Sequence, residues 1–170
     1  MKNALDFFRG YWDNLRKDID TLAGITPGTE ACFLVGSSHD IPCFIHYIQP
    51  MEVTATDRAE IRSVIERQLK AFQNDDAIGA FAFASPGIQM RFKSPENFME
   101  MVKTAYQAVY RPRSVLFEDL TKMGGVLTQP VLLLDAEGVL MRALYLMEKQ
   151  ADASWRINGC YVIPVETSSH

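Results

Sequence analysis

The fold is decided by residues 139–149, which read VLMRALYLMEK. Successive side chains of a β-strand point to opposite faces, so this stretch divides into two sets. One face carries Val139, Met141, Ala143, Tyr145 and Met147. The other face is also largely apolar and carries Leu140, Arg142, Leu144, Leu146 and Glu148. A strand with one face in water would alternate more cleanly, so we expect both faces to be covered.

Three neighbouring segments share this period of two and predict a sheet together with residues 139–149. They are residues 114–120, 125–134 and 155–165. The connections are short enough for hairpins and lie at residues 121–124, 135–138 and 150–154. Short links between consecutive strands give antiparallel pairs, so we expect an antiparallel meander of four strands.

The segment before the sheet has the period of helices. An apolar stripe at helical spacing runs from Ile61 to Phe72. Thr56 or Asp57 can cap this helix, with Glu60 placed to complete a capping box. A second helix is expected over residues 77–84, where alanine and phenylalanine predominate.

Ser85-Pro86-Gly87 is expected to end that second helix. Ile88–Phe92 alternates between apolar and polar residues, as a short strand does. Ser94-Pro95-Glu96 predicts a helix start, with serine as N-cap, proline in the first position and an acid in the first turn. Helices followed by a sheet indicate the α+β class.

Residues 1–52 are expected to form an extension in front of an α+β domain that covers residues 53–170. Helical spacing predicts an amphipathic helix over residues 4–22, and two apolar runs, 31–35 and 41–48, predict a hairpin. The helix stripe is expected to pack on its own domain or a sister subunit, or to dock on another protein. With the second face of the sheet, it supplies the candidate partner-binding residues, which are Phe8, Trp12, Leu15, Ile19, Leu144 and Leu146.

Composition excludes several classes of function. The net charge of −4 and the lack of a basic tract argue against binding nucleic acid. No apolar run reaches the roughly 18–20 residues that span a bilayer, and the N-terminus lacks a secretory signal, so the expected compartment is the cytoplasm. No metal site or cofactor is expected, because zinc-binding clusters and the nucleotide, zinc-protease and serine-hydrolase motifs are missing.

Several stretches of the chain resemble one known family. They are DRAEIRSVIERQL at residues 57–69 with Ala71-Phe72 and Asp75-Asp76 behind it, FAFASP at 81–86, YRPRSV at 110–115 and WRINGC at 155–160. Together they resemble a bacterial family of unknown function, number 4864, over roughly residues 54–165. That family is similar to the nuclear-transport-factor-two-like superfamily, also called SnoaL-like or cystatin-like. The resemblance implies a cone-shaped fold whose curved sheet wraps a long helix, and it implies no reaction.

A pocket in such a cone can be outlined from the aromatic and sulfur side chains. Its candidate residues are Tyr106, Tyr110, Tyr145 and Trp155 at the open end, with Met90, Met141 and Cys160 deeper. Aromatic bodies with polar tips suit a small apolar ligand. Ordinary core packing is the alternative interpretation of the same residues.

Enzymes of this superfamily need a titratable group inside the cone. The three histidines, His39, His46 and His170, lie outside the resembling region. Glu118 and Asp119 are adjacent on a predicted strand, so one of them must face inward. These two carboxylates are the candidate catalytic bases.

The sequence therefore favours a non-enzymatic binding or assembly module. We expect a homodimer through the sheet, with room for a small apolar molecule in the cone. The alternative is an isomerase or cyclase that uses Glu118 or Asp119 as base and a tyrosine as proton donor.

Overall fold

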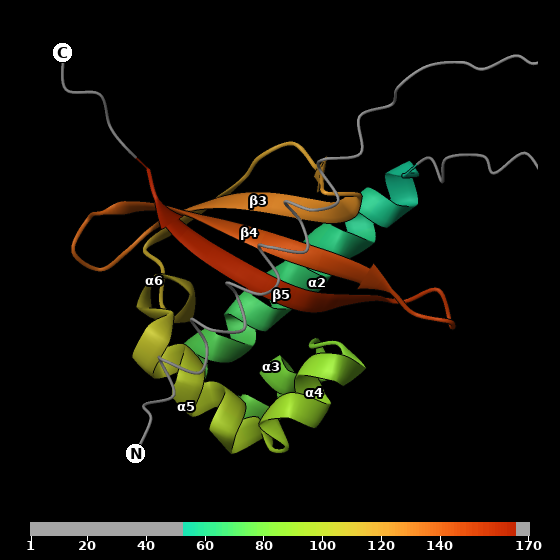
Figure 1. Cartoon of the computed structure of the whole chain (residues 1–170). Helices are drawn as coiled ribbons and strands as arrows, with labels where there is room; N and C mark the ends of the chain where they lie inside the picture. The colour runs from blue at the N-terminus through green and yellow to red at the C-terminus, as the bar shows by residue number, and fades with distance from the viewer. Residues whose placement is uncertain (1–52, 166–170) are drawn as a thin grey trace, which may run out of the picture.

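The computed structural model describes residues 53–165 (Figure 1). The predicted N-terminal helix with Phe8, Trp12, Leu15 and Ile19, the predicted hairpin, and the three histidines lie outside these residues. Within the described part, helices come first and an open antiparallel sheet follows, so the α+β class is confirmed. The helices are α2 (Ala55–Gln73), α3 (Ala77–Ala82), α4 (Pro86–Phe92), α5 (Pro95–Ala105) and α6 (Gln107–Tyr110).

Four of these helices begin at a polar residue that caps the first turn. The N-caps of α2, α3, α4 and α5 are Thr54, Asp76, Ser85 and Ser94, and each side chain accepts a hydrogen bond from a backbone N–H. The predicted start at Ser94 is confirmed. The start of α2 was predicted too late, because Thr54 and Asp57 form the capping box that we assigned to Asp57 and Glu60.

The predicted strand Ile88–Phe92 is wrong, since these residues belong to α4. Ser85 is the N-cap of that helix and Pro86 occupies its first turn, so the motif that was expected to end one helix begins another. Only Ala84 pairs with the sheet here, in an isolated parallel bridge to Ile157. Five alternating residues are too few to separate a strand from a helix by periodicity.

The strands are β1 (Ser114–Phe117), β2 (Thr121–Met123), β3 (Val126–Leu134), β4 (Leu140–Lys149) and β5 (Trp155–Pro164). The sheet order is β1-β3-β4-β5, with β2 also on β3, and every pair is antiparallel, which confirms the meander.

The first predicted strand is divided in two. Phe117 pairs with Val131, and Thr121 pairs with Thr128, so residues 118–120 of one edge face only residues 129–130 of β3. The extra residue bends the edge as a bulge does. Residues 121–123, which we assigned to a connection, form β2, and the turn itself lies at the two glycines 124 and 125 with positive φ of 56° and 81°.

One face of the sheet packs against the helices and forms the core. In Figure 1, α2 runs along this face and α3, α4 and α5 lie on the same side. The core joins α2 and α5 to the inward side chains of β3, β4 and β5, and includes Ile61, Ile65, Phe72, Phe98, Val131, Leu133, Ala143, Tyr145 and Ile157.

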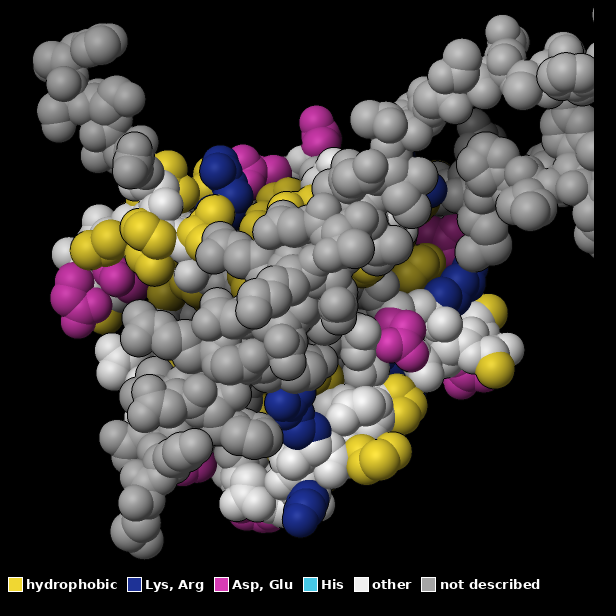
Figure 2. All heavy atoms as spheres, in the orientation of Figure 1, with side chains coloured by type: hydrophobic (Ala, Val, Ile, Leu, Met, Phe, Trp, Pro, Cys, Tyr) yellow, Lys and Arg dark blue, Asp and Glu magenta, His cyan; other side chains and the backbone are white. Residues whose placement is uncertain are grey.

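The opposite, outer face of the sheet is also apolar, as the sequence predicts. Alternation places Leu140, Arg142, Leu144 and Leu146 of β4 on it. Leu146 is buried, whereas Leu116 of β1 and Ile163 of β5 are 61% and 42% exposed. Figure 2 shows hydrophobic side chains gathered at the end of the sheet where β5 finishes and the β3–β4 turn lies.

Candidate functional site

A cavity lies between the helices and the inner face of β4 and β5. Its volume is about 60 Å³. Its wall consists of Gln68, Phe72, Ala84, Ile88, Phe92, Phe98, Met101, Val102, Tyr106, Val109, Tyr145, Ile157, Gly159 and Cys160. None of these side chains carries a charge at neutral pH, so the cavity suits an uncharged, mostly apolar occupant.

Aromatic rings form the helical side of this wall. Phe98 of α5 lies with its ring centroid 6.0 Å from that of Phe72, 5.4 Å from that of Phe92 and 5.5 Å from that of Phe81. Tilted and edge-on arrangements at these separations are favourable. The packed rings fix the relative positions of α2, α3, α4 and α5, and these helices form one side of the cavity.

Gln68 is the polar helical residue of the wall, and it is 3% exposed. Its side-chain amide donates a hydrogen bond to the backbone carbonyl of Ala80 at 3.1 Å. A buried amide that is bound in this way supports the fold at little desolvation cost. Gln68 therefore ties α2 to α3 beside the cavity.

Tyr145 and Cys160 are cross-strand partners on the sheet side of the wall. Tyr145 is 1% exposed, and within the part of the chain that the structure describes its hydroxyl oxygen has no hydrogen-bond partner other than the neighbouring thiol of Cys160. Burial raises the pKa of Tyr145 well above its usual value, and the neighbouring Cys160 adds to this shift. Burial also raises the pKa of the Cys160 thiol to about 12. Both groups are therefore neutral at physiological pH, and Cys160 is not a thiolate nucleophile.

The structure brings three of the seven candidate pocket residues together in this wall: Tyr106, Tyr145 and Cys160. Met90 is 78% exposed on α4, which corrects our expectation of a deep position. It was placed inward by a strand that does not exist, and on the helix its side chain points to solvent. Met141, Tyr110 and Trp155 contribute nothing to the wall.

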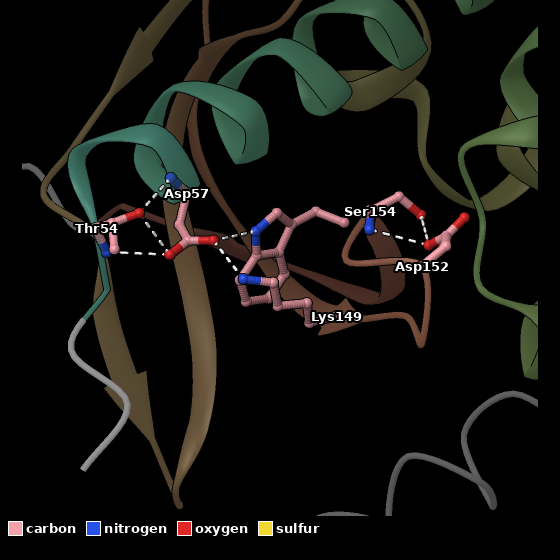
Figure 3. A network of polar contacts seen from close by, with 6 residues as sticks. Thr54, Asp57, Lys149, Asp152 and Ser154 are labelled. Atoms are coloured by element: carbon pink, nitrogen blue, oxygen red, sulfur yellow. Dashed lines mark hydrogen bonds and ion pairs between the residues drawn. The ribbon is translucent and has the colours of Figure 1, made fainter. Parts of the chain in front are cut away.

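Trp155 instead bonds to a polar network at the start of α2, in which Figure 3 labels Thr54, Asp57 and Lys149. Its indole N–H donates to Asp57 at 2.9 Å, and the ammonium of Lys149 donates to the same carboxylate oxygen at 2.8 Å. The backbone N–H and hydroxyl of Thr54 donate to the other oxygen, at 3.0 and 2.7 Å. The hydrogen bonds from Lys149, Thr54 and Trp155 lower the pKa of Asp57 far below its usual 3.8.

Tyr110 belongs to a second polar cluster, at the end of α2. Its hydroxyl donates to Asp75, whose carboxylate also pairs with Lys103 at 2.9 Å and Arg111 at 2.7 Å. These bonds, the one from Tyr110 foremost, lower the pKa of Asp75. The cluster joins α2, α5 and α6 at the surface.

The two candidate catalytic carboxylates lie outside the cavity wall. Glu118 accepts hydrogen bonds from Arg142 at 2.7 and 3.0 Å, on the outer face of the sheet. Asp119 is exposed at the bend between β1 and β2. The inward carboxylate that we expected is therefore wrong. Glu118 faces outward by the alternation of β1, in which Phe117 faces the core, and Asp119 would face inward had the bulge at residues 118–120 not ended the alternation.

The helical half of the wall is what sequence reasoning missed. Phe72 belongs to the predicted apolar helix stripe, but nothing in the pattern distinguished a residue beside a cavity from one in solid core. Val109 of α6 lies in a four-residue helix that periodicity is too short to reveal.

Other kinds of site find no support in residues 53–165. No group of three or more His, Cys, Asp or Glu side chains lies close enough to hold a metal ion there. None of the helices in this part of the chain is both long and apolar enough to cross a membrane.

Comparison with known proteins identifies one family. The model of the family described as a domain of unknown function (DUF4864) matches residues 54–170. No curated protein and no solved structure matches the chain. The family match covers more than half of the chain, which therefore belongs to the DUF4864 family.

Proposed function

We propose that this member of the DUF4864 family is a non-enzymatic module that binds a small, largely apolar molecule in the cavity beneath β4 and β5. The cavity itself is the observation that carries the proposal. Its volume of about 60 Å³ is several times the roughly 10–15 Å³ that one water molecule requires. An apolar space in an otherwise packed core forfeits contacts, which a matching ligand would restore.

The wall supports binding over catalysis. Proton transfer requires a group that can change its charge near neutral pH. The wall contains no carboxylate, histidine or lysine, and the pKa values of Tyr145 and Cys160 in the wall are raised. Glu118, which the isomerase alternative requires, is paired with Arg142 on the other face of the sheet.

The arrangement of elements supports the nuclear-transport-factor-two-like superfamily as the wider relationship. A long helix, α2, lies along the inner face of an antiparallel meander, and shorter helices close one end. The resemblance of the sequence to that superfamily points in the same direction. We propose the cone-shaped fold on these two grounds.

The test is native mass spectrometry of the full chain, together with a variant whose cavity is filled. Val102→Leu combined with Val109→Leu adds two methylene groups to the wall. We expect the wild-type chain to carry a small molecule, or to take up methylenecyclohexane as a probe, and the filled variant to do neither. Val115→Leu, the same change on exposed β1, is the matched control and should bind as wild type does.

The proposal is overturned if saturation-transfer NMR detects no binding of the probe to the wild-type chain, and no molecule co-purifies. It is also overturned if the filled variant, still folded by thermal unfolding, binds as well as the control.

The outer face of the sheet supports assembly as a second part of the function. We propose that two copies associate through this face. A two-fold interface places the same patch on both copies, so an apolar patch with paired charges at its centre is self-complementary. The outer face has this form, with Leu144 and Leu146 beside the Arg142–Glu118 pair.

Light scattering after size exclusion tests the assembly. We expect a dimer for the full chain and a monomer after Leu116→Lys, which places a charge on the outer face. Ile78→Lys is the control, because Ile78 is 72% exposed on α3, away from the sheet. A monomeric wild-type chain, or equal effects of the two substitutions, would contradict the homodimer.

A further inference from the structure

The hydroxyl of Tyr145 is the one polar group of the cavity wall that the fold buries without a strong hydrogen-bond partner in the described residues. Tyr145 is 1% exposed, and within residues 53–165 its hydroxyl oxygen has no hydrogen-bond partner other than the neighbouring thiol of Cys160. Native proteins pair nearly all buried polar groups, and a buried group left unpaired loses the hydrogen bonds it made to water. A ligand in the cavity could supply the strong hydrogen-bond partner that the Tyr145 hydroxyl lacks.

The immediate neighbours of this hydroxyl cannot replace that partner. Cys160 lies beside it on β5, but thiol sulfur is a weak acceptor and a weak donor. Gln68 of the same wall donates its side-chain amide to Ala80. The remaining residues of the wall are hydrocarbon or aromatic in character, apart from the backbone of Gly159 and the ring of Tyr106.

The chemical class of the ligand follows from these surroundings. We propose that the ligand is neutral, has an apolar body, and bears one acceptor oxygen, of the carbonyl type, that accepts a hydrogen bond from Tyr145. A carboxylate is excluded because its charge would be buried among apolar side chains with no cation in the wall. A pure hydrocarbon would fill the space but leave the hydroxyl unpaired.

Tyrosine is well suited to this role because it stays a donor. The raised pKa of Tyr145 keeps the phenol protonated throughout the physiological range. A site built to donate one hydrogen bond discriminates strongly against an analogue that lacks the acceptor. This inference rests on the proposed function, since it requires that the cavity bind a ligand at all.

Two probes of nearly equal shape test it on the full chain. Cyclohexanone has an acceptor oxygen where methylenecyclohexane has a CH2 group. We expect wild type to bind the ketone about tenfold more tightly than the alkene in saturation-transfer titrations. Tyr145→Phe should bind both probes equally, at the affinity that wild type has for the alkene.

A second readout does not depend on the variant folding. The carbonyl carbon of 13C-labelled cyclohexanone shifts downfield when its oxygen accepts a hydrogen bond, so the bound signal in wild type should move in that direction. If wild type binds both probes equally and the carbonyl signal does not move, this inference fails while the proposed function stands. If wild type binds neither probe, both fail.

A ketone preference that persists in folded Tyr145→Phe would also overturn the inference, because another donor would then be responsible. Tyr106→Phe is the matched control, since it removes a hydroxyl from a second tyrosine of the wall. We expect it to keep the tenfold preference of wild type.

Discussion

The carboxylate of Asp57, in the first turn of α2, accepts a hydrogen bond at 2.9 Å from the indole of Trp155, which lies 98 residues later at the start of β5. Lys149 at the end of β4 donates to the same oxygen at 2.8 Å. The side chain of Asp57 thus completes the capping box of α2 and bonds the β4–β5 hairpin to this helix (Figure 3). The network therefore joins the first helix of the described domain to its last two strands.

Asp57→Asn should make the melting temperature of the protein less dependent on pH in the acidic range. The pKa of Asp57 is lower in the folded protein than its usual 3.8, so the carboxylate stabilises the fold above that pH. This contribution is lost as the pH falls through the folded pKa. We therefore expect a lower melting temperature than wild type at pH 7, and a difference that shrinks below about pH 4.

Glu66→Gln is the control for that experiment. Glu66 pairs with Arg62 at 2.8 Å on the same helix, but both side chains are at least half exposed. Solvent and salt screen such a pair, so the substitution should change little at either pH. A difference between wild type and Asp57→Asn that is constant from pH 7 to pH 3 would show that the carboxylate is not held in its charged form.

Trp155→Phe should destabilise the domain less than Asp57→Asn does. Phenylalanine keeps an aromatic ring at a position that is 8% exposed, but it has no N–H to donate. Lys149 and Thr54 still satisfy the carboxylate. Urea unfolding of both variants gives the order, and a larger loss for Trp155→Phe would mean that ring packing outweighs the hydrogen bond.

Ser85→Ala should cost about 1–2 kcal/mol of folding free energy, and it tests why residues 86–92 are helical. Ser85 is fully buried, its hydroxyl donates to Asn158 at 2.7 Å, and it accepts from the N–H of Ile88 at 3.3 Å. Alanine removes the cap and leaves Asn158 without this donor. The measurement is chemical denaturation followed by circular dichroism.

Ser94→Ala is the matched control, because Ser94 caps α5 in the same way at an exposed position. Water can replace a lost exposed hydrogen bond, so we expect a loss nearer to 0.5 kcal/mol. Equal losses at the two serines would contradict the structural role that we assign to the contact between Ser85 and β5.

These residues also show how far the sequence predicts the fold. The meander and the helix start at Ser94 depend on local patterns, and both are confirmed. The network of Asp57 depends on side chains that meet across most of the chain, and no local pattern contains it. The same limit explains why Trp155 was assigned to the pocket.

The sequence predicted two wall residues on the sheet side of the candidate site, Tyr145 and Cys160, and one on its helical side, Tyr106. Tyr145 and Cys160 lie on the same, helix-facing side because they are cross-strand partners in regular stretches of β4 and β5, where the strand fixes the direction of each side chain. Alternation predicted the wrong side-chain directions where the strand was irregular or absent. The bulge left Asp119 exposed instead of inward, Glu118 follows the alternation of β1 to the outer face, and a short helix in place of a strand carried Met90 into solvent.

Glu118→Gln should leave ligand binding unchanged, because Glu118 pairs with Arg142 on the face of the sheet opposite the cavity. We expect the affinities for cyclohexanone and methylenecyclohexane to stay within twofold of wild type, whereas Tyr145→Phe should lower only the affinity for the ketone. The same substitution should weaken self-association, because it removes a charge from the outer face that we propose as the interface. Affinity from saturation-transfer titration and mass from light scattering separate the two effects on one sample. If folded Glu118→Gln lost ketone binding, Glu118 would contribute to the ligand site, and the enzymatic alternative would be favoured.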